Sequence, residues 1–164
     1  MMTRRNTLFS LGAVAAVIAS VGSLFDPTVV HAAQVFPYAK TDAQWKDLLT
    51  PDQYRVLRKA GTEAPYTSPL NKEKRAGTYA CAGCAQALFV SSTKFDSGTG
   101  WPSFYQPIDK KAVVEDTDST LGMKRTEVLC SNCGGHLGHV FDDGPKPTGL
   151  RYCMNGIAMN FKAA

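Results

Sequence analysis

The sequence predicts a mainly β domain of antiparallel strands, with two or three short helices near its start and a pair of metal-binding turns. Helical periodicity is found at residues 41–61, after which the chain breaks into short apolar runs separated by turn residues. Two Cys-x-x-C pairs lie among these runs. Short strands joined by turns favour antiparallel pairing, because parallel strands need long crossover connections.

The first 32 residues have the layout of a cleavable export signal. Arg4 and Arg5 precede an apolar run at 8–25, and Val-His-Ala at 30–32 supplies a cleavage site. The paired arginines suggest the twin-arginine route. An uncleaved membrane anchor is the alternative, because 18 residues can just span a bilayer. We expect export to the periplasm or another extracytoplasmic space, without stable membrane insertion once the signal is removed.

Residues 33–164 are long enough for one domain with one core, which we place at about 40–161. The whole chain carries 18 Lys and Arg against 14 Asp and Glu, a net charge of +4. Its basic clusters at 72–75 and 110–111 lack interleaved aromatic residues. They indicate solvated surface, so we expect a monomer that does not bind nucleic acid.

Two helices are predicted just after the leader. Thr-Asp-Ala-Gln at 41–44 has the capping-box pattern, and Thr-Pro-Asp-Gln at 50–53 repeats it with proline at the first helical position. Gly61 is expected to end the second helix. The apolar stripe of the first helix is Trp45, Leu48 and Leu49. The predicted strands follow at 87–90, 112–114, 126–129, 150–155 and 158–161.

Four of the five cysteines form the pairs 81–84 and 130–133, which are separated by 45 residues (85–129). This spacing is typical of one tetrahedral zinc site in which each pair supplies two thiolates. Disulfides, redox-active pairs and an iron–sulfur centre are the alternatives. Because four protein ligands leave no open position, the zinc would be structural. The predicted ligands of one Zn²⁺ are Cys81, Cys84, Cys130 and Cys133.

Cys153 is the cysteine that remains, and it is the natural candidate for chemistry. On a strand it would share a face with Arg151 and Asn155, and a nearby cation favours the thiolate. A buried, inert cysteine is the alternative. After the leader the sequence has two histidines, His136 and His139, directly behind the second pair. They could donate protons in a thiolate reaction, or one could be structural or lie beside the zinc.

Four motifs then occur in an order that resembles the peptide methionine-(R)-sulfoxide reductases, the B-type family. They are YACAGC at 79–84, KFDSGTGWPSF at 94–104, CSNCGGHLGHVF at 130–141 and RYCMN at 151–155. The resemblance covers about residues 40–161. It implies two antiparallel sheets in a tent-like arrangement, one structural zinc, and reduction of the R epimer of methionine sulfoxide in oxidised proteins and peptides, as repair under oxidative stress.

The resemblance also implies roles for single residues. Cys153 would attack the sulfoxide sulfur and become a sulfenic acid, with Arg151 stabilising its thiolate. Trp101 would pack on the methyl group of the substrate. The implied catalytic residues are Cys153, His139, His136 and Asn155, and the implied substrate-binding residues are Trp101, Arg151 and Phe141.

Thr99 departs from the family pattern, because many members carry a second redox cysteine there. The resemblance therefore implies a one-cysteine variant whose sulfenic acid is recycled by an external thiol, either a thioredoxin-like protein or a small thiol. Two other classes stay open. One is a zinc-ribbon binding module without catalysis, in which Cys153 is inert. The other is a thiol–disulfide oxidoreductase that uses the Cys-x-x-C pairs.

Overall fold

A computed structural model of the protein describes residues 34–118 and 125–164. The leader proposed for residues 1–32, with its possible anchor, lies outside the described residues. Within these ranges, none of the helices has the length and hydrophobicity that crossing a bilayer would require.

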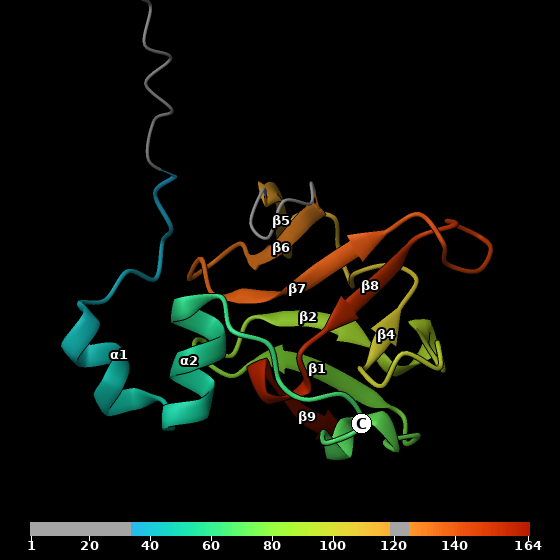
Figure 1. The fold of residues 1–164 in the computed structure, drawn as a ribbon, viewed down its shortest axis with the longest axis horizontal. Helices are drawn as coiled ribbons and strands as arrows, with labels where there is room; N and C mark the ends of the chain where they lie inside the picture. The colour runs from blue at the N-terminus through green and yellow to red at the C-terminus, as the bar shows by residue number, and fades with distance from the viewer. Residues whose placement is uncertain (1–33, 119–124) are drawn as a thin grey trace, which may run out of the picture. The chain divides into compact units, whose positions relative to one another are not determined.

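The described chain folds into two antiparallel sheets, as the sequence predicts (Figure 1). The smaller sheet has the order β2-β1-β9, and the larger sheet has the order β3-β4-β8-β7-β6-β5. The strands of the smaller sheet are β1 (Gly77–Cys81), β2 (Ala87–Val90) and β9 (Met159–Ala163). Those of the larger sheet are β3 (Lys94–Phe95), β4 (Ser103–Phe104), β5 (Val113–Asp118), β6 (Arg125–Cys130), β7 (His136–Phe141) and β8 (Arg151–Met154).

Two short helices lie at one end of the sheets, α1 (Asp42–Leu48) and α2 (Pro51–Lys59) (Figure 1). Both predicted capping boxes form, with each threonine hydroxyl accepting a hydrogen bond from the backbone N–H of the glutamine three residues later. Two details of the prediction are wrong. The side chain of Leu48 is 50% exposed and does not join the core. Helix α2 ends at Lys59, and its C-cap is Ala60, which takes the left-handed conformation one residue before Gly61.

The predicted strands are confirmed with small changes at their ends. The strand predicted at 150–155 is shorter, because β8 ends at Met154 and Asn155 begins the 3₁₀ helix η4 (Gly156–Ala158). The sequence did not predict β1, β7 and the two-residue strands β3 and β4. Strand β7 has the sequence HLGHVF, with a glycine at its centre and no β-branched run, so its pairing with β6 and β8 is what defines it. Two further 3₁₀ helices are η1 (Pro69–Asn71) and η2 (Ser91–Thr93).

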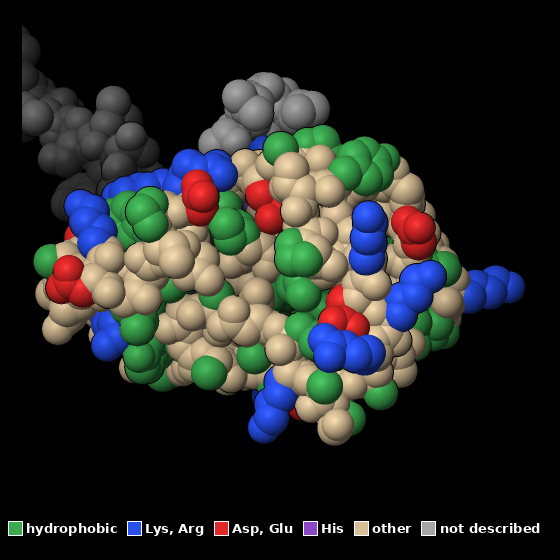
Figure 2. Space-filling model, turned by 90° about the horizontal axis from the view of Figure 1, so that it is seen from below, with side chains coloured by type: hydrophobic (Ala, Val, Ile, Leu, Met, Phe, Trp, Pro, Cys, Tyr) green, Lys and Arg blue, Asp and Glu red, His purple; other side chains and the backbone are tan. Residues whose placement is uncertain are grey.

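The core contains a group of aromatic side chains that contact one another between the two sheets. Phe89 of the smaller sheet stacks on Phe104 of the larger sheet, with ring centroids 4.4 Å apart. Tyr79 meets Phe104 edge to face at 4.9 Å. These contacts cross from one sheet to the other, so they fix the position of β4 beside β8. One face of the molecule shows lysine and arginine side chains dispersed among acidic and hydrophobic ones (Figure 2).

Candidate active site and metal centre

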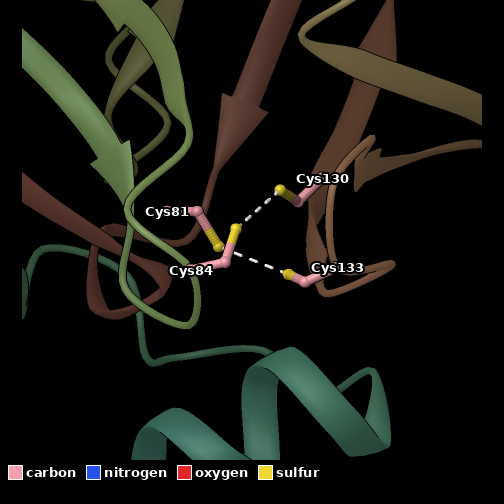
Figure 3. Close-up of side chains that lie close together, drawn as sticks. All are labelled: Cys81, Cys84, Cys130 and Cys133. Atoms are coloured by element: carbon pink, nitrogen blue, oxygen red, sulfur yellow. Dashed lines mark hydrogen bonds between the residues drawn. The ribbon is translucent and has the colours of Figure 1, made fainter. Parts of the chain in front are cut away.

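The four cysteines of the Cys-x-x-C pairs meet at one point between the sheets (Figure 3). Cys81 ends β1 and Cys84 lies in the turn before β2, whereas Cys130 ends β6 and Cys133 lies in the turn before β7. Their sulfur atoms lie within 4.8 Å of one another, with Cys81 3.7 Å from Cys133 and Cys84 3.5 Å from Cys130. The cluster therefore joins the smaller sheet to the larger one.

The geometry of the cluster fits a zinc ion. A tetrahedral site with Zn–S bonds of about 2.3 Å places its sulfurs roughly 3.8 Å apart, close to the observed spacings. All four cysteines are free of disulfides, whose sulfurs would be about 2.05 Å apart. Hydrogen bonding to Cys130 is the largest cause of a raised pKa at Cys81 and of a lowered pKa at Cys84. Without a cation, thiols and thiolates must therefore coexist, whereas a divalent ion would allow all four to ionise.

Cys153 lies in the middle of the larger sheet, on β8. In the strand register, His139 of β7 lies opposite it on one side and Ser103 of β4 lies opposite it on the other. Directly opposed residues of antiparallel strands project to the same face. Cys153 and His139 both line a pocket of about 120 Å³. The residues that line this pocket are Thr62, Trp101, Arg125, Gly138, His139, Phe141, Cys153 and Asn155.

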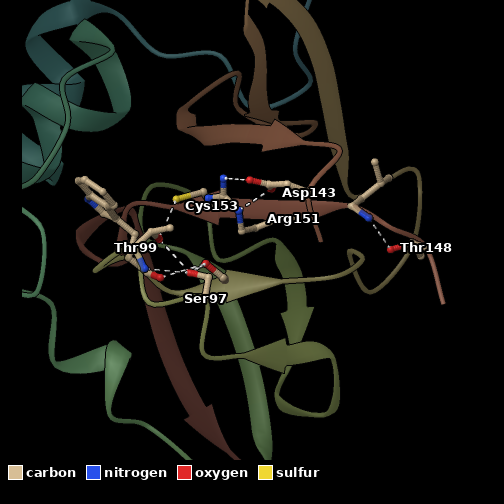
Figure 4. Close-up of polar contacts among 9 residues, drawn as sticks. Ser97, Thr99, Asp143, Thr148, Arg151 and Cys153 are labelled. Atoms are coloured by element: carbon tan, nitrogen blue, oxygen red, sulfur yellow. Dashed lines mark hydrogen bonds and ion pairs between the residues drawn. The ribbon is translucent and has the colours of Figure 1, made fainter. Parts of the chain in front are cut away.

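A chain of hydroxyl groups reaches the sulfur of Cys153 (Figure 4). The Oγ1 of Thr99 lies 3.8 Å from this sulfur and 2.8 Å from the Oγ of Ser97. The Oγ of Ser97 is in turn 2.7 Å from the Oγ of Ser103. At Thr99, therefore, a hydroxyl group and not the thiol of a second redox cysteine lies beside the candidate nucleophile.

Arg151 is held behind Cys153 by an ion pair (Figure 4). Its Nε donates to Asp143 at 2.8 Å and its Nη2 donates to the second oxygen of the same carboxylate at 2.9 Å. The guanidinium carbon also lies 4.3 Å from the ring centroid of Phe141. Burial is the largest influence on Cys153 and raises its thiol pKa, while the hydrogen bond from Thr99 and the charge of Arg151 act in the opposite direction.

His139 is oriented by a carboxylate. Its Nε2 lies 2.9 Å from an oxygen of Asp118, which also accepts from Arg125 at 2.7 Å. Because a carboxylate only accepts, Nε2 carries the hydrogen in the neutral ring and Nδ1 is left as the nitrogen that can take a proton. Burial lowers the pKa of His139 below its ordinary value of 6.5, against the opposing effect of Asp118.

His136 lies deeper than His139. His136 is only 3% exposed, and its Nδ1 is 2.5 Å from an oxygen of Glu127. The two imidazole rings meet edge to face with centroids 5.4 Å apart. Among the described residues, the buried Nε2 of His136 has no hydrogen-bond partner. His136 therefore stands behind His139, outside the set of residues that line the pocket.

The structure thus brings most of the predicted site residues into one place and separates the others. Cys153, His139, Asn155, Trp101 and Phe141 line the pocket, whereas Arg151 and His136 support it from behind. Sequence reasoning missed several residues of the site. They are Arg125 and Thr62 in the pocket wall and the carboxylates Asp118, Glu127 and Asp143 that hold the two histidines and Arg151.

The arrangement is suited to a reaction between a thiol and a small polar group on an apolar side chain. The thiol of Cys153, the imidazole of His139 and the rings of Trp101 and Phe141 all line one pocket, and these are the groups that nucleophilic catalysis by a cysteine requires. This convergence disfavours a binding module in which Cys153 is inert. The gathering of all four Cys-x-x-C thiols into one cluster likewise disfavours two separate redox pairs.

Comparison with known proteins agrees with this arrangement. Residues 49–163 match the SelR domain family. The chain is 58% identical over 123 residues to a peptide methionine sulfoxide reductase MsrB of Leptospira interrogans, covering 75% of this chain and 94% of that relative. It is also 58% identical over 123 residues to an MsrB of Agrobacterium fabrum, covering 75% and 91%. An MsrB of Methanosarcina barkeri is 55% identical over 123 residues, covering 75% and 87%.

Proposed function

The chain belongs to the MsrB family of peptide methionine sulfoxide reductases, and from that premise we propose that Cys153 reduces the R epimer of methionine sulfoxide in oxidised proteins and peptides. One observation carries the proposal. Cys153 and His139 lie opposite each other on neighbouring strands, in a pocket of about 120 Å³ that Trp101 also lines. A thiol, a proton carrier and an apolar wall then meet at one substrate side chain.

The reaction begins when the sulfur of Cys153 attacks the sulfoxide group. The methionine sulfur gains two electrons and is reduced to the thioether, while Cys153 is oxidised by two electrons and keeps the oxygen as a sulfenic acid. The methyl group of the substrate lies against Trp101 and the oxygen faces His139. The rest of the methionine side chain leads out of the pocket. All three substituents of the chiral sulfur then have fixed places, so the pocket accepts one epimer.

His139 carries the proton of this step. The pKa of Cys153 is raised above its ordinary value of 9.0 and that of His139 is lowered below 6.5, in both cases chiefly by burial. At neutral pH the pair therefore consists of a thiol and a neutral imidazole. Nδ1 of His139 accepts the thiol proton as the sulfur attacks, and then delivers it to the sulfoxide oxygen.

The sulfenic acid is recycled by an external reductant. Thr99 has no thiol, and the remaining cysteines form the metal cluster. A thiol of a thioredoxin-like protein or a small thiol attacks the sulfenic sulfur, releases water and forms a mixed disulfide with Cys153. A second thiol then resolves this disulfide and restores Cys153. The sum is the conversion of methionine sulfoxide and two thiols into methionine, a disulfide and water.

The metal and the leader complete the proposal. Cys81, Cys84, Cys130 and Cys133 would hold one structural zinc, which supplies a crosslink between the two sheets and takes no part in the chemistry. The leader at residues 1–32 supports export, and so repair of oxidised proteins outside the cytoplasm. A twin-arginine route suits this protein, because zinc can then be bound before the thiols meet an oxidising compartment.

A single-turnover experiment tests the activity and the recycling step together. The reduced protein is mixed with the R or the S epimer of a peptide methionine sulfoxide, without reductant, and both the methionine formed and the intact mass are measured. We expect about one methionine and one trappable sulfenic acid per chain with the R epimer, and neither product with the S epimer. Cys153→Ser should abolish both products while keeping its zinc.

Two results would contradict the proposal. Similar amounts of methionine from the two epimers would refute the placement of the substrate between Trp101 and His139. An internal disulfide formed together with zinc release would show that a cluster cysteine resolves the sulfenic acid, and the external reductant would then be unnecessary.

A further inference from the structure

Glu63 is a buried carboxylate that binds the turn behind the active site. Its side chain is 7% exposed, although it lies on an irregular segment between α2 and η1. Its carboxylate accepts hydrogen bonds from the backbone N–H of Gly156 at 2.5 Å and of Ile157 at 3.1 Å. These are the first residues of η4, the 3₁₀ helix that Asn155 caps and that follows the strand of Cys153.

The main chain of Glu63 holds two walls of the catalytic pocket. Its N–H donates to Oδ1 of Asn155 at 2.9 Å, and its carbonyl accepts from Nε1 of Trp101 at 3.1 Å. Asn155 is fixed from its other side as well, because its Nδ2 donates to the carbonyl of Leu137 at 3.1 Å. Both Asn155 and Trp101 line the pocket, whereas Glu63 does not.

The approach of the Glu63 segment to η4 is close. A Cβ atom built on Gly156 would lie 1.9 Å from the Oγ of Ser68 and 3.3 Å from a carboxylate oxygen of Glu63. On its outer side the carboxylate borders a separate cavity of about 650 Å³, which includes neither Cys153 nor His139. Glu63 therefore does not line the catalytic pocket, and its hydrogen bonds to the pocket wall are those with Asn155 and Trp101.

We propose that Glu63 is a positioning residue that sets the distance between the Asn155 wall and the Trp101 wall of the pocket. Its carboxylate anchors the segment to η4, and the anchored main chain then holds both walls by one hydrogen bond each. Loss of the carboxylate leaves the buried N–H of Gly156 and the partly buried N–H of Ile157 unsatisfied and releases the segment. The proposal rests on the proposed function, because its consequence is how well the pocket seats the sulfoxide side chain.

The test is Glu63→Gln, which keeps the size of the side chain but replaces one accepting oxygen with an NH₂ group. We expect kcat/KM for the R epimer to fall by about tenfold, mainly through KM. The rate of Cys153 alkylation by iodoacetamide and its pH midpoint should not change, because Glu63 does not contact the thiol. Glu73→Gln is the matched control, since Glu73 lines the same outer cavity and pairs with Arg75 instead. It should leave KM unchanged.

A second measurement is independent of turnover. Trp45 and Trp101 are the two tryptophans of the chain, so in a Trp45→Phe background the fluorescence reports Trp101. Glu63→Gln should shift its emission maximum in that background, and Glu73→Gln should not. Glu63→Asp, which keeps the charge but shortens the reach, is expected to give the same shift and the same rise in KM. It serves as the second variant if Glu63→Gln does not fold.

An unchanged KM and an unchanged emission maximum in either folded variant would overturn the proposal. So would a parallel loss of alkylation and zinc in both variants, because that result would assign Glu63 to general stability. Absence of R-epimer reduction in the unmodified protein would instead refute the proposed function, while the emission shift would still report whether Glu63 positions Trp101.

Discussion

At the scale of single residues, Cys153 is balanced between opposing influences on its ionisation. Burial raises the pKa of its thiol, the Thr99 hydroxyl and Arg151 lower it, and the Asp143 carboxylate raises it again. Asp143 thus has two effects, since it also fixes the guanidinium of Arg151 through two hydrogen bonds. Thr99 lowers this pKa through its hydroxyl group, which a single substitution can remove without changing the shape of the side chain.

We predict that Thr99→Val raises the pKa of Cys153 further, because it removes a hydroxyl donor to the thiolate and keeps the shape of the side chain. A higher pKa means less thiolate at neutral pH. Alkylation of Cys153 followed against pH should therefore shift to higher pH, and the rate at neutral pH should fall by roughly 2- to 10-fold, the equivalent of one hydrogen bond.

Thr99→Ser is the control, because it retains the hydroxyl and should keep the midpoint of the unmodified protein. If Thr99→Val and Thr99→Ser titrate alike, the contact of 3.8 Å between Oγ1 and the sulfur has no electrostatic role.

The residues of the site differ in how far the sequence could predict them. The sequence predicts Cys153 as a site residue because it is the cysteine outside the two pairs. It predicts the two histidines because they are rare in this chain and directly follow the second pair. Their carboxylate partners were not found. Asp118 lies 21 positions from His139, and the carboxylate of Glu63 lies 93 positions from the Gly156 N–H that donates to it. Acidic residues are common on surfaces, so the fold alone shows which of them face a catalytic group.

At the scale of the elements, the contact between β7 and β8 depends on Gly138. This residue pairs with Met154, and a Cβ at its position would lie 2.1 Å from the carbonyl oxygen of Cys153. The two strands that carry His139 and Cys153 can approach each other here because Gly138 has no side chain. The sequence marked this glycine as part of a motif, without indicating that a strand runs through it.

We predict that Gly138→Ala lowers kcat/KM by about 10²-fold, because the added methyl group must push β8 away from β7 and so separates Cys153 from His139. Steady-state kinetics with the R epimer measures this effect. Gly83→Ala is the matched control, since its Cβ would meet its nearest neighbour, Trp45, at an ordinary distance of 3.4 Å. An active Gly138→Ala protein would show that β7 and β8 tolerate a wider spacing than the pairing suggests.

At the scale of the whole molecule, the cysteine cluster holds together two sheets that otherwise share an aromatic core. One turn of each sheet contributes two of its ligands. The pairs and their spacing are visible in the sequence, so the metal site could be predicted from local patterns. The sequence could not predict which sheet each pair belongs to, because β1 and β7 have no strong strand signal of their own.

We predict that Cys84→Ser, or removal of the metal by a chelator, abolishes cooperative thermal unfolding and activity together, although the cluster lies apart from the pocket. Structural zinc contributes roughly 10–16 kcal/mol of apparent binding free energy, and a domain of this size is stable by about 5–15 kcal/mol in all. Calorimetry with parallel zinc analysis checks the result. A metal-free protein with full activity and an unchanged unfolding midpoint would contradict it.

A metal crosslink would also lower the conformational entropy of the unfolded chain. A metal that remains bound at Cys81 and Cys133 closes a loop of about 50 residues, and this closure removes about 4 kcal/mol of chain entropy at 25 °C. Strands β2 to β6 lie within that loop. Strand β7 begins at His136, directly after the loop closes, and β8 and β9 lie further along the chain. The strand that carries Cys153 is therefore the part of the larger sheet that lies furthest beyond the closed loop, and its return after unfolding gains least from the metal.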